Sequence, residues 1–171
     1  MKNESLRRLA YTAAGTALAF VLLLLFGAVM PVGVVGAAAL ASFAVAAVVY
    51  LADERYAAAC FLASLVLAFF FLPTKAPAVY FGIYFGAYPI FRSSLDKHSF
   101  GFVLPLIVKC AVAELAVWIL LLLARPLGIT LPFFFVLFGT VLAPLGALVY
   151  DFAFSELYRL LVRLLERIKK R

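Results

Sequence analysis

Three ionisable side chains lie inside long apolar stretches of this 171-residue chain: Lys109, Glu114 and Asp151. A charged group inside a membrane is costly, so it usually pairs with an opposite charge or belongs to a functional site. Counted along the predicted helices from their inner ends, Asp151 lies roughly 5 Å deep and Lys109 about 12 Å deep. The four-carbon stem of a lysine lets its ammonium group reach sideways. We therefore expect Lys109 and Asp151 to form a structural ion pair.

Glu114 has no obvious partner in the sequence. It lies about 20 Å deep, and its distance of five residues from Lys109 turns it about 140° around the helix. Two interpretations remain open. The carboxyl group is protonated and hydrogen-bonded, for example to a tyrosine, or it faces a pocket and meets a cationic ligand or a proton. We favour the second interpretation, in which Glu114 binds a ligand.

A four-residue repeat places Tyr80, Tyr84 and Tyr88 on one stripe of a helix, beside Gly82 and Gly86. A tyrosine hydroxyl inside a membrane needs a hydrogen-bond partner. Such a column indicates either a cavity for an aromatic or cationic ligand or an ordinary interior seam supplemented by interfacial tyrosines. We expect Tyr80 and Tyr84 to line a ligand site together with Glu114, and Tyr88 to lie near the inner surface.

The remaining reactive residue types indicate neither an enzyme nor a cofactor. Cys60 and Cys110 lie in apolar runs, as buried structural cysteines do, and His98 alone cannot form a zinc site, which needs three or four ligands. We find no phosphate-binding loop, no paired catalytic carboxylates and no Ser/His/Asp set. We therefore predict a protein with no metal, no cofactor and no enzymatic activity.

The composition determines the class of protein that must hold these residues. Hydrophobic residues make up 68% of the chain and charged residues 13%, whereas soluble domains have about 45–50% apolar and about 25% charged residues. The chain also has a net charge of +7, but most of this charge flanks apolar segments, where it sets topology rather than binding nucleic acid. The sequence therefore predicts an integral membrane protein.

Proline, glycine and charged residues separate the apolar segments, as they do at helix boundaries. We predict an all-α, polytopic membrane protein with six transmembrane helices over residues 9–29, 33–51, 56–72, 76–91, 101–124 and 131–154. The third and fourth helices are short, reaching only about 25 Å against a hydrocarbon core of roughly 30 Å. They are either short spans or a re-entrant hairpin.

The positions of the basic residues predict the orientation. Six crossings with the N-terminus inside leave only Lys75 and Arg125 on the outer side and Lys109 within a span, so the other Lys and Arg residues collect on the inner side. We expect a protein of the cytoplasmic (inner) membrane with both termini in the cytoplasm.

Residues 1–154 are expected to form one membrane domain, and residues 155–171 a cytoplasmic, amphipathic basic tail helix. Leucines lie on one face of this tail and Arg159, Arg163 and Arg167 on the other. Such helices lie along the membrane surface, where each basic residue contributes about 1 kcal/mol near anionic lipid. Membrane lipid is therefore the expected partner of the tail, and a cytoplasmic protein is the alternative.

Alanine pairs mark the first helix at a spacing of four residues: Ala10 with Ala14, and Ala13 with Ala17. Small residues let helix backbones approach closely in lipid. These pairs either pack the first helix on the second or form a surface for a partner subunit.

With its six predicted helices, its inside termini and these alanine pairs, the chain resembles an S component of an energy-coupling factor transporter. The resemblance implies capture of a vitamin or similar micronutrient in a pocket near the outer face. It also implies docking of the alanine-rich helix on a transmembrane coupling subunit driven by ATPases. The loop at 30–33 is shorter than the loop with which S components close their pocket. Transport of a small molecule is thus the first functional hypothesis.

Two other functions agree with the same pattern. The chain is similar in outline to the small six-helix subunit of bacterial cell-elongation machinery, which suggests a non-transporting scaffold that assembles through the alanine surface and the tail. A small oligomeric carrier of lipid or ions is the third hypothesis, with Glu114 and the Lys109/Asp151 pair lining a path. A pocket at Glu114 favours capture, a dry interior favours the scaffold, and a two-sided polar path favours the carrier.

Overall fold

The computed structural model describes residues 2–29, 33–97, 103–124, 126, 128 and 133–169. These residues form helices and turns and contain no strand, which confirms the all-α class. Contacts divide the chain into two compact units, Met1–His98 and Ser99–Arg171. Several features singled out from the sequence lie outside the described residues: the loop residues 30–32, His98, Arg125, Lys170 and Arg171.

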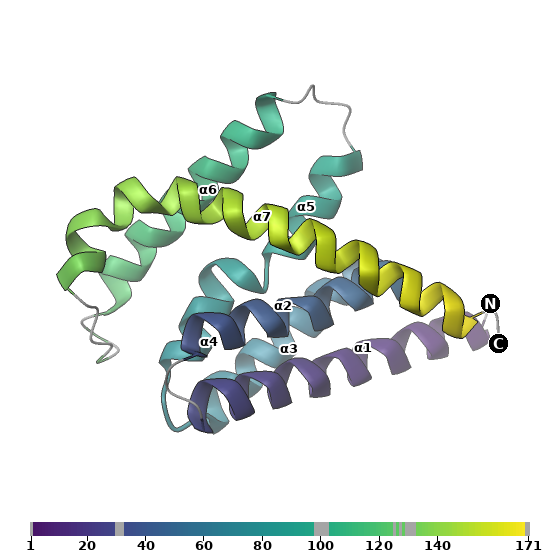
Figure 1. Ribbon diagram of the computed structural model, residues 1–171. Helices are drawn as coiled ribbons and strands as arrows, with labels where there is room; N and C mark the ends of the chain where they lie inside the picture. Colours follow the sequence, from purple (N-terminus) through teal and green to yellow (C-terminus); the bar gives the residue numbers. More distant parts are fainter. Residues whose placement is uncertain are drawn as a thin grey trace. The chain divides into compact units, whose positions relative to one another are not determined.

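The first unit is built around three long helices. The helix α1 covers Lys2–Leu24 and continues as a π-helical turn, η1, over Leu25–Val29. The helices α2 (Val34–Leu51) and α3 (Glu54–Phe71) pack against α1 and against each other (Figure 1). Small residues allow this close packing. A methyl group added at Gly15 of α1 would overlap Val48 of α2 and crowd the sulfur of Cys60 on α3.

Polar groups mark both ends of α3. The carboxylate of Asp53 accepts a hydrogen bond of 2.7 Å from the backbone N–H of Glu54, as a helix cap does. At the other end, Leu72 precedes Pro73 and is extended, because a proline disfavours helical backbone in the residue before it. The ammonium of Lys75 then donates to the carbonyl oxygens of Phe69 and Leu72, at 2.6 and 3.0 Å.

The predicted fourth helix is broken in the structure. It consists of α4 (Ala76–Tyr80), a π-helical turn η3 (Phe81–Phe85) and α5 (Tyr88–Lys97), which extends six residues past the expected end. This broken helix runs antiparallel to α3: Gly82 fits against Leu65, and Gly86 against Phe61. The Lys97 ammonium lies 3.0 Å from the Glu54 carboxylate, at the first residue of α3. The segment therefore follows α3 over most of its length.

The second unit is a pair of packed helices, α6 (Val103–Ala124) and α7 (Phe133–Lys169). The helix α7 has 37 residues. It runs without a break despite Pro144 in its interior (Figure 1). The sequence predicts a membrane helix that ends at residue 154 and a tail helix that begins after it. In the structure the two are one helix, with no break in the backbone at residue 154. The helix continues because residues 153–169 contain neither proline nor glycine and consist mostly of good helix formers.

Five helices among the described residues are long and apolar enough to cross a membrane: Asn3–Gly27, Val34–Leu51, Glu54–Phe71, Leu104–Ala124 and Val141–Arg167. The segments α4, η3 and α5 are each too short to cross by themselves. The structure therefore has the apolar helices of a membrane protein, and the count of six crossings stays a prediction.

Candidate functional site

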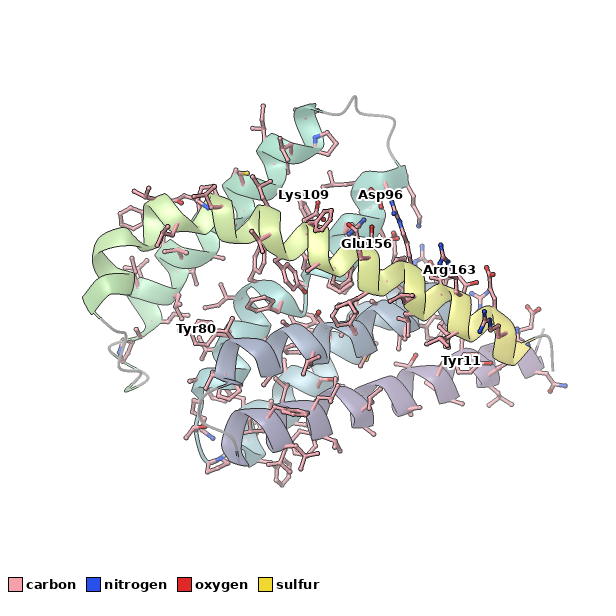
Figure 2. All side chains as sticks on the ribbon, viewed as in Figure 1. Tyr11, Tyr80, Asp96, Lys109, Glu156 and Arg163 are labelled. Carbon is pink, nitrogen blue, oxygen red and sulfur yellow. The ribbon has the colours of Figure 1, made fainter. Side chains whose placement is uncertain are left out.

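Lys109 of α6 and Asp151 of α7 lie together within the second unit. The Lys109 Nζ donates to Asp151 Oδ2 at 2.8 Å, and the two side chains are 12% and 21% exposed. Figure 2 shows Lys109 on α6 where this helix crosses α7. Lys109 lies at the N-terminal end of the buried face of α6. The residues of this face that follow are Ala113, Ala116, Leu120 and Ala124. This ion pair therefore ties the two helices at the face by which α6 is buried.

Glu114 lies on a different face of α6. Cys110, Val117 and Leu121, at a spacing of three to four residues, share this face with it, and all four side chains are half-buried. The Oε2 oxygen of Glu114 is enclosed and has no hydrogen-bond partner among the described residues. An enclosed acceptor without a donor costs about 1–3 kcal/mol. A ligand that brings a cation or a hydrogen-bond donor to this oxygen would recover that free energy.

The tyrosine stripe belongs to the broken helix of the first unit. Tyr80 ends α4 and is half-buried, Tyr84 lies in the π-helical turn η3 and is also half-buried, and Tyr88 begins α5 and is 3% exposed (Figure 2, Tyr80). The rings of Tyr84 and Tyr88 are 5.5 Å apart between centroids. Irregular helix turns of this type are frequent at functional sites.

The predicted ligand residues divide between the two units. Tyr80 and Tyr84 belong to the unit Met1–His98, whereas Glu114 belongs to the unit Ser99–Arg171. Each unit is defined by its own contacts. A pocket shared by Glu114 and the two tyrosines therefore stays a prediction.

The alanine pairs of α1 lie on its exposed face. Ala10, Ala13, Ala14 and Ala17 are all exposed. The face of α1 that meets the other helices of the unit carries a different set: Thr12, Gly15, Ala19 and Leu23, all buried. The alanines therefore do not pack α1 on α2. They form an outward surface, which we call the alanine face.

The tail arginines also lie on the surface. Arg159, Arg163 and Arg167 are exposed along the last part of α7. Arg159 is 3.1 Å from Glu156, with both side chains more than half exposed. This pair is an ordinary surface ion pair and contributes at most about 1 kcal/mol.

Three contacts in the first unit were not anticipated from the sequence. The Glu54–Lys97 ion pair joins residues from two predicted loops, and their opposite charges were the only available signal. Lys75 caps α3, as a cation near a helix C-terminus can do. Ser64 of α3 donates to the Cys60 carbonyl at 2.7 Å beside α1. Of these three, the Glu54–Lys97 pair joins α3 to the neighbouring α5, whereas the other two stabilise α3 itself.

The described residues include no group of three or more His, Cys, Asp or Glu side chains that could hold a metal ion. Cys60 is buried and Cys110 half-buried, and both are free thiols. Comparison of the sequence with family models and with characterised proteins, and of the fold with solved structures, gives no match. The proposed function is therefore based on the residues and their geometry.

Proposed function

We propose that this protein is a small membrane subunit that captures a micronutrient-sized molecule and docks on a separate energising membrane protein. The observation that carries the proposal is the enclosed, unpartnered Oε2 oxygen of Glu114 on a half-buried face of α6. A carboxylate in such apolar surroundings selects a ligand with a cationic or hydrogen-bond-donating group.

The exposed alanine face of α1 supports the docking half of the proposal. Its side chains are small, so another transmembrane helix can approach the backbone of α1 closely. Docking through an alanine-rich helix is what the resemblance to S components of energy-coupling factor transporters implies. The partner proposed for this face is a transmembrane coupling subunit that acts with ATPases.

The substitution Glu114→Gln tests the capture half. It removes the negative charge but keeps the shape, so we expect ligand affinity to fall by about tenfold to a hundredfold, while the melting temperature stays equal or rises. The measurement is native mass spectrometry of the gently purified protein, followed by titration with whichever small molecule co-purifies.

Glu4→Gln is the matched control, because it removes an exposed carboxylate from the same chain. Equal retention of the small molecule by the wild type and by Glu114→Gln would contradict the role of Glu114. Purified protein that carries only phospholipid and no small molecule would contradict capture itself.

A non-transporting scaffold is the second candidate function. The alanine face favours it independently of Glu114, since assembly needs only an exposed surface. In that case the protein co-purifies with membrane proteins but without ATPases, and Glu114→Gln leaves this association unchanged.

A further inference from the structure

One exposed face of α7 changes from apolar to charged along its length. Residues three or four positions apart share a helix face. Followed toward the C-terminus, this face carries Val141, Leu145, Val149 and Phe152 and then Glu156, Arg159, Arg163 and Arg167, all exposed. The apolar members are 58% to 72% exposed, as side chains that face lipid tails are. The change places the membrane surface between Phe152 and Glu156.

Beyond this point α7 continues as a helix and remains partly apolar. Leu157, Leu160 and Leu164 are 48%, 52% and 56% exposed. Around the helix they lie next to the arginine positions, so the segment has an apolar edge beside a basic edge. Helices with this arrangement lie at the boundary between lipid headgroups and acyl chains, where each edge meets the environment that suits it.

We propose that the segment from Glu156 to Arg167 of α7 binds the headgroups of anionic phospholipids. In this arrangement the leucines contact the acyl chains and the three arginines bind lipid phosphates. The segment begins where the lipid-facing surface of α7 ends, so its first turn lies at the height of the headgroups. A tilt of α7 in the membrane keeps the following turns near the same surface. Guanidinium groups also bind phosphate through paired hydrogen bonds. Figure 2 shows Glu156 and Arg163 on this part of α7.

Glu156 does not block this role. Its ion pair with Arg159 spans 3.1 Å and both side chains are exposed, at 55% and 67%. An exposed pair of this kind is weak, so a lipid phosphate can replace the carboxylate at Arg159. The inference does not depend on the ligand proposed for Glu114, because it uses a different helix segment and different chemistry.

The first test compares lipid binding by the full-length protein and two variants. Detergent-solubilised protein is titrated with phosphatidylglycerol or phosphatidylcholine of the same acyl chains, and native mass spectrometry counts the bound lipids. We expect the wild type to prefer phosphatidylglycerol. The triple change Arg159→Gln, Arg163→Gln and Arg167→Gln should lose about fivefold in that preference per arginine, the equivalent of about 1 kcal/mol each.

The triple change of the same arginines to Lys is the matched control, because it keeps the charge and the helix. It should retain most of the preference for phosphatidylglycerol. An unchanged preference in the triple Gln variant would overturn the proposal.

The second test measures where the leucine edge lies. In a Trp118→Phe background, which removes the single tryptophan, Leu160→Trp provides one fluorescent reporter. In vesicles that contain phosphatidylglycerol, we expect blue-shifted emission that brominated lipid quenches. Glu166→Trp, on the polar side of the same segment, should emit as in water. Water-like, unquenched emission from Leu160→Trp would show that the segment projects into solution or meets a protein, and would overturn the proposal.

Discussion

The ion pair between Lys109 and Asp151 joins α6 to α7. Its atoms lie 2.8 Å apart and its side chains are mostly enclosed. When one partner of such a pair is removed, the other charge is left without compensation, which costs more than removal of both. The energetic role of the pair is therefore measurable as a coupling between the two residues.

We predict that Lys109→Ala and Asp151→Ala each lower the free energy of unfolding by about 2–4 kcal/mol. The double change should cost less than the sum of the two by at least about 1 kcal/mol. The measurement is reversible unfolding in detergent micelles, analysed as a double-mutant cycle. The same cycle on the exposed Glu156/Arg159 pair is the control and should give a coupling of at most about 0.5 kcal/mol. Additive losses at Lys109 and Asp151 would mean that the pair does not hold α6 to α7.

The sequence predicted the contact between Lys109 and Asp151, but not the surroundings of Glu114. The sequence spacing of Lys109 and Asp151 within adjacent apolar segments was sufficient to predict their contact. For Glu114 the spacing gave the direction of the side chain, which indeed differs from that of Lys109. The enclosure of its Oε2 oxygen depends on the packing of neighbouring side chains, and no sequence pattern reports this.

At the scale of elements, α1 presents small residues on two opposite faces. Gly15 and Ala19 lie on the face that packs within the unit, whereas Ala13 and Ala17 lie on the exposed face. Side-chain size is therefore similar on both faces, and the sequence left open which one packs inward. The close approach of Gly15 to Val48 on α2 decides the question.

The two faces of α1 should respond differently to the same chemical change. We predict that Ala19→Leu lowers stability by about 1–3 kcal/mol, because the added atoms overfill a fully buried position. Ala17→Leu should change stability by less than about 0.5 kcal/mol but should remove a docked partner from the purified complex. Thermal unfolding and co-purification measure the two effects. Retention of the partner by Ala17→Leu would show that docking uses another surface.

The ends of helices were predictable where an apolar segment stops at a charged residue or a proline. The second and third helices were placed within two residues of α2 and α3, because Asp53 and Pro73 end apolar segments with a charge or a proline. The last membrane helix and the tail helix, predicted on either side of residue 154, form one continuous helix, because the polarity changes there while the helix propensity does not. The π-helical turn η3 arises beside Gly82 and Gly86, where helix propensity is low and α3 approaches closely.

At the scale of the whole molecule, the broken helix determines the number of crossings. From Ala76 to Lys97 the segments α4, η3 and α5 follow α3 in the opposite direction, with Gly82 against Leu65, Gly86 against Phe61 and Lys97 beside Glu54. The 20 helical residues among them would rise about 30 Å as a regular α-helix, which matches a hydrocarbon core of roughly 30 Å. The neighbouring α3 is itself long and apolar enough to cross. A crossing by the broken helix beside α3, and with it the total of six crossings, stays a prediction.

We therefore predict that both termini lie on the cytoplasmic side and that Lys75 lies on the outer side. Reporter fusions to each terminus and an accessibility reporter inserted at residue 75 measure this. A fusion at residue 97 is the internal control and should report the cytoplasmic side. Termini on opposite sides would mean that α4 and α5 return to the side they came from, leaving five crossings.

The Lys109–Asp151 pair also has a consequence for how the chain is made. The two residues are 42 positions apart, so the ribosome delivers Lys109 to the membrane well before its partner has been synthesised. A lysine in the middle of a new membrane helix opposes insertion by about 2.5–3.5 kcal/mol. The many leucines of α6 must offset this cost alone until α7 arrives. Insertion of α6 therefore demands a more apolar helix than the folded protein needs once the ion pair has formed.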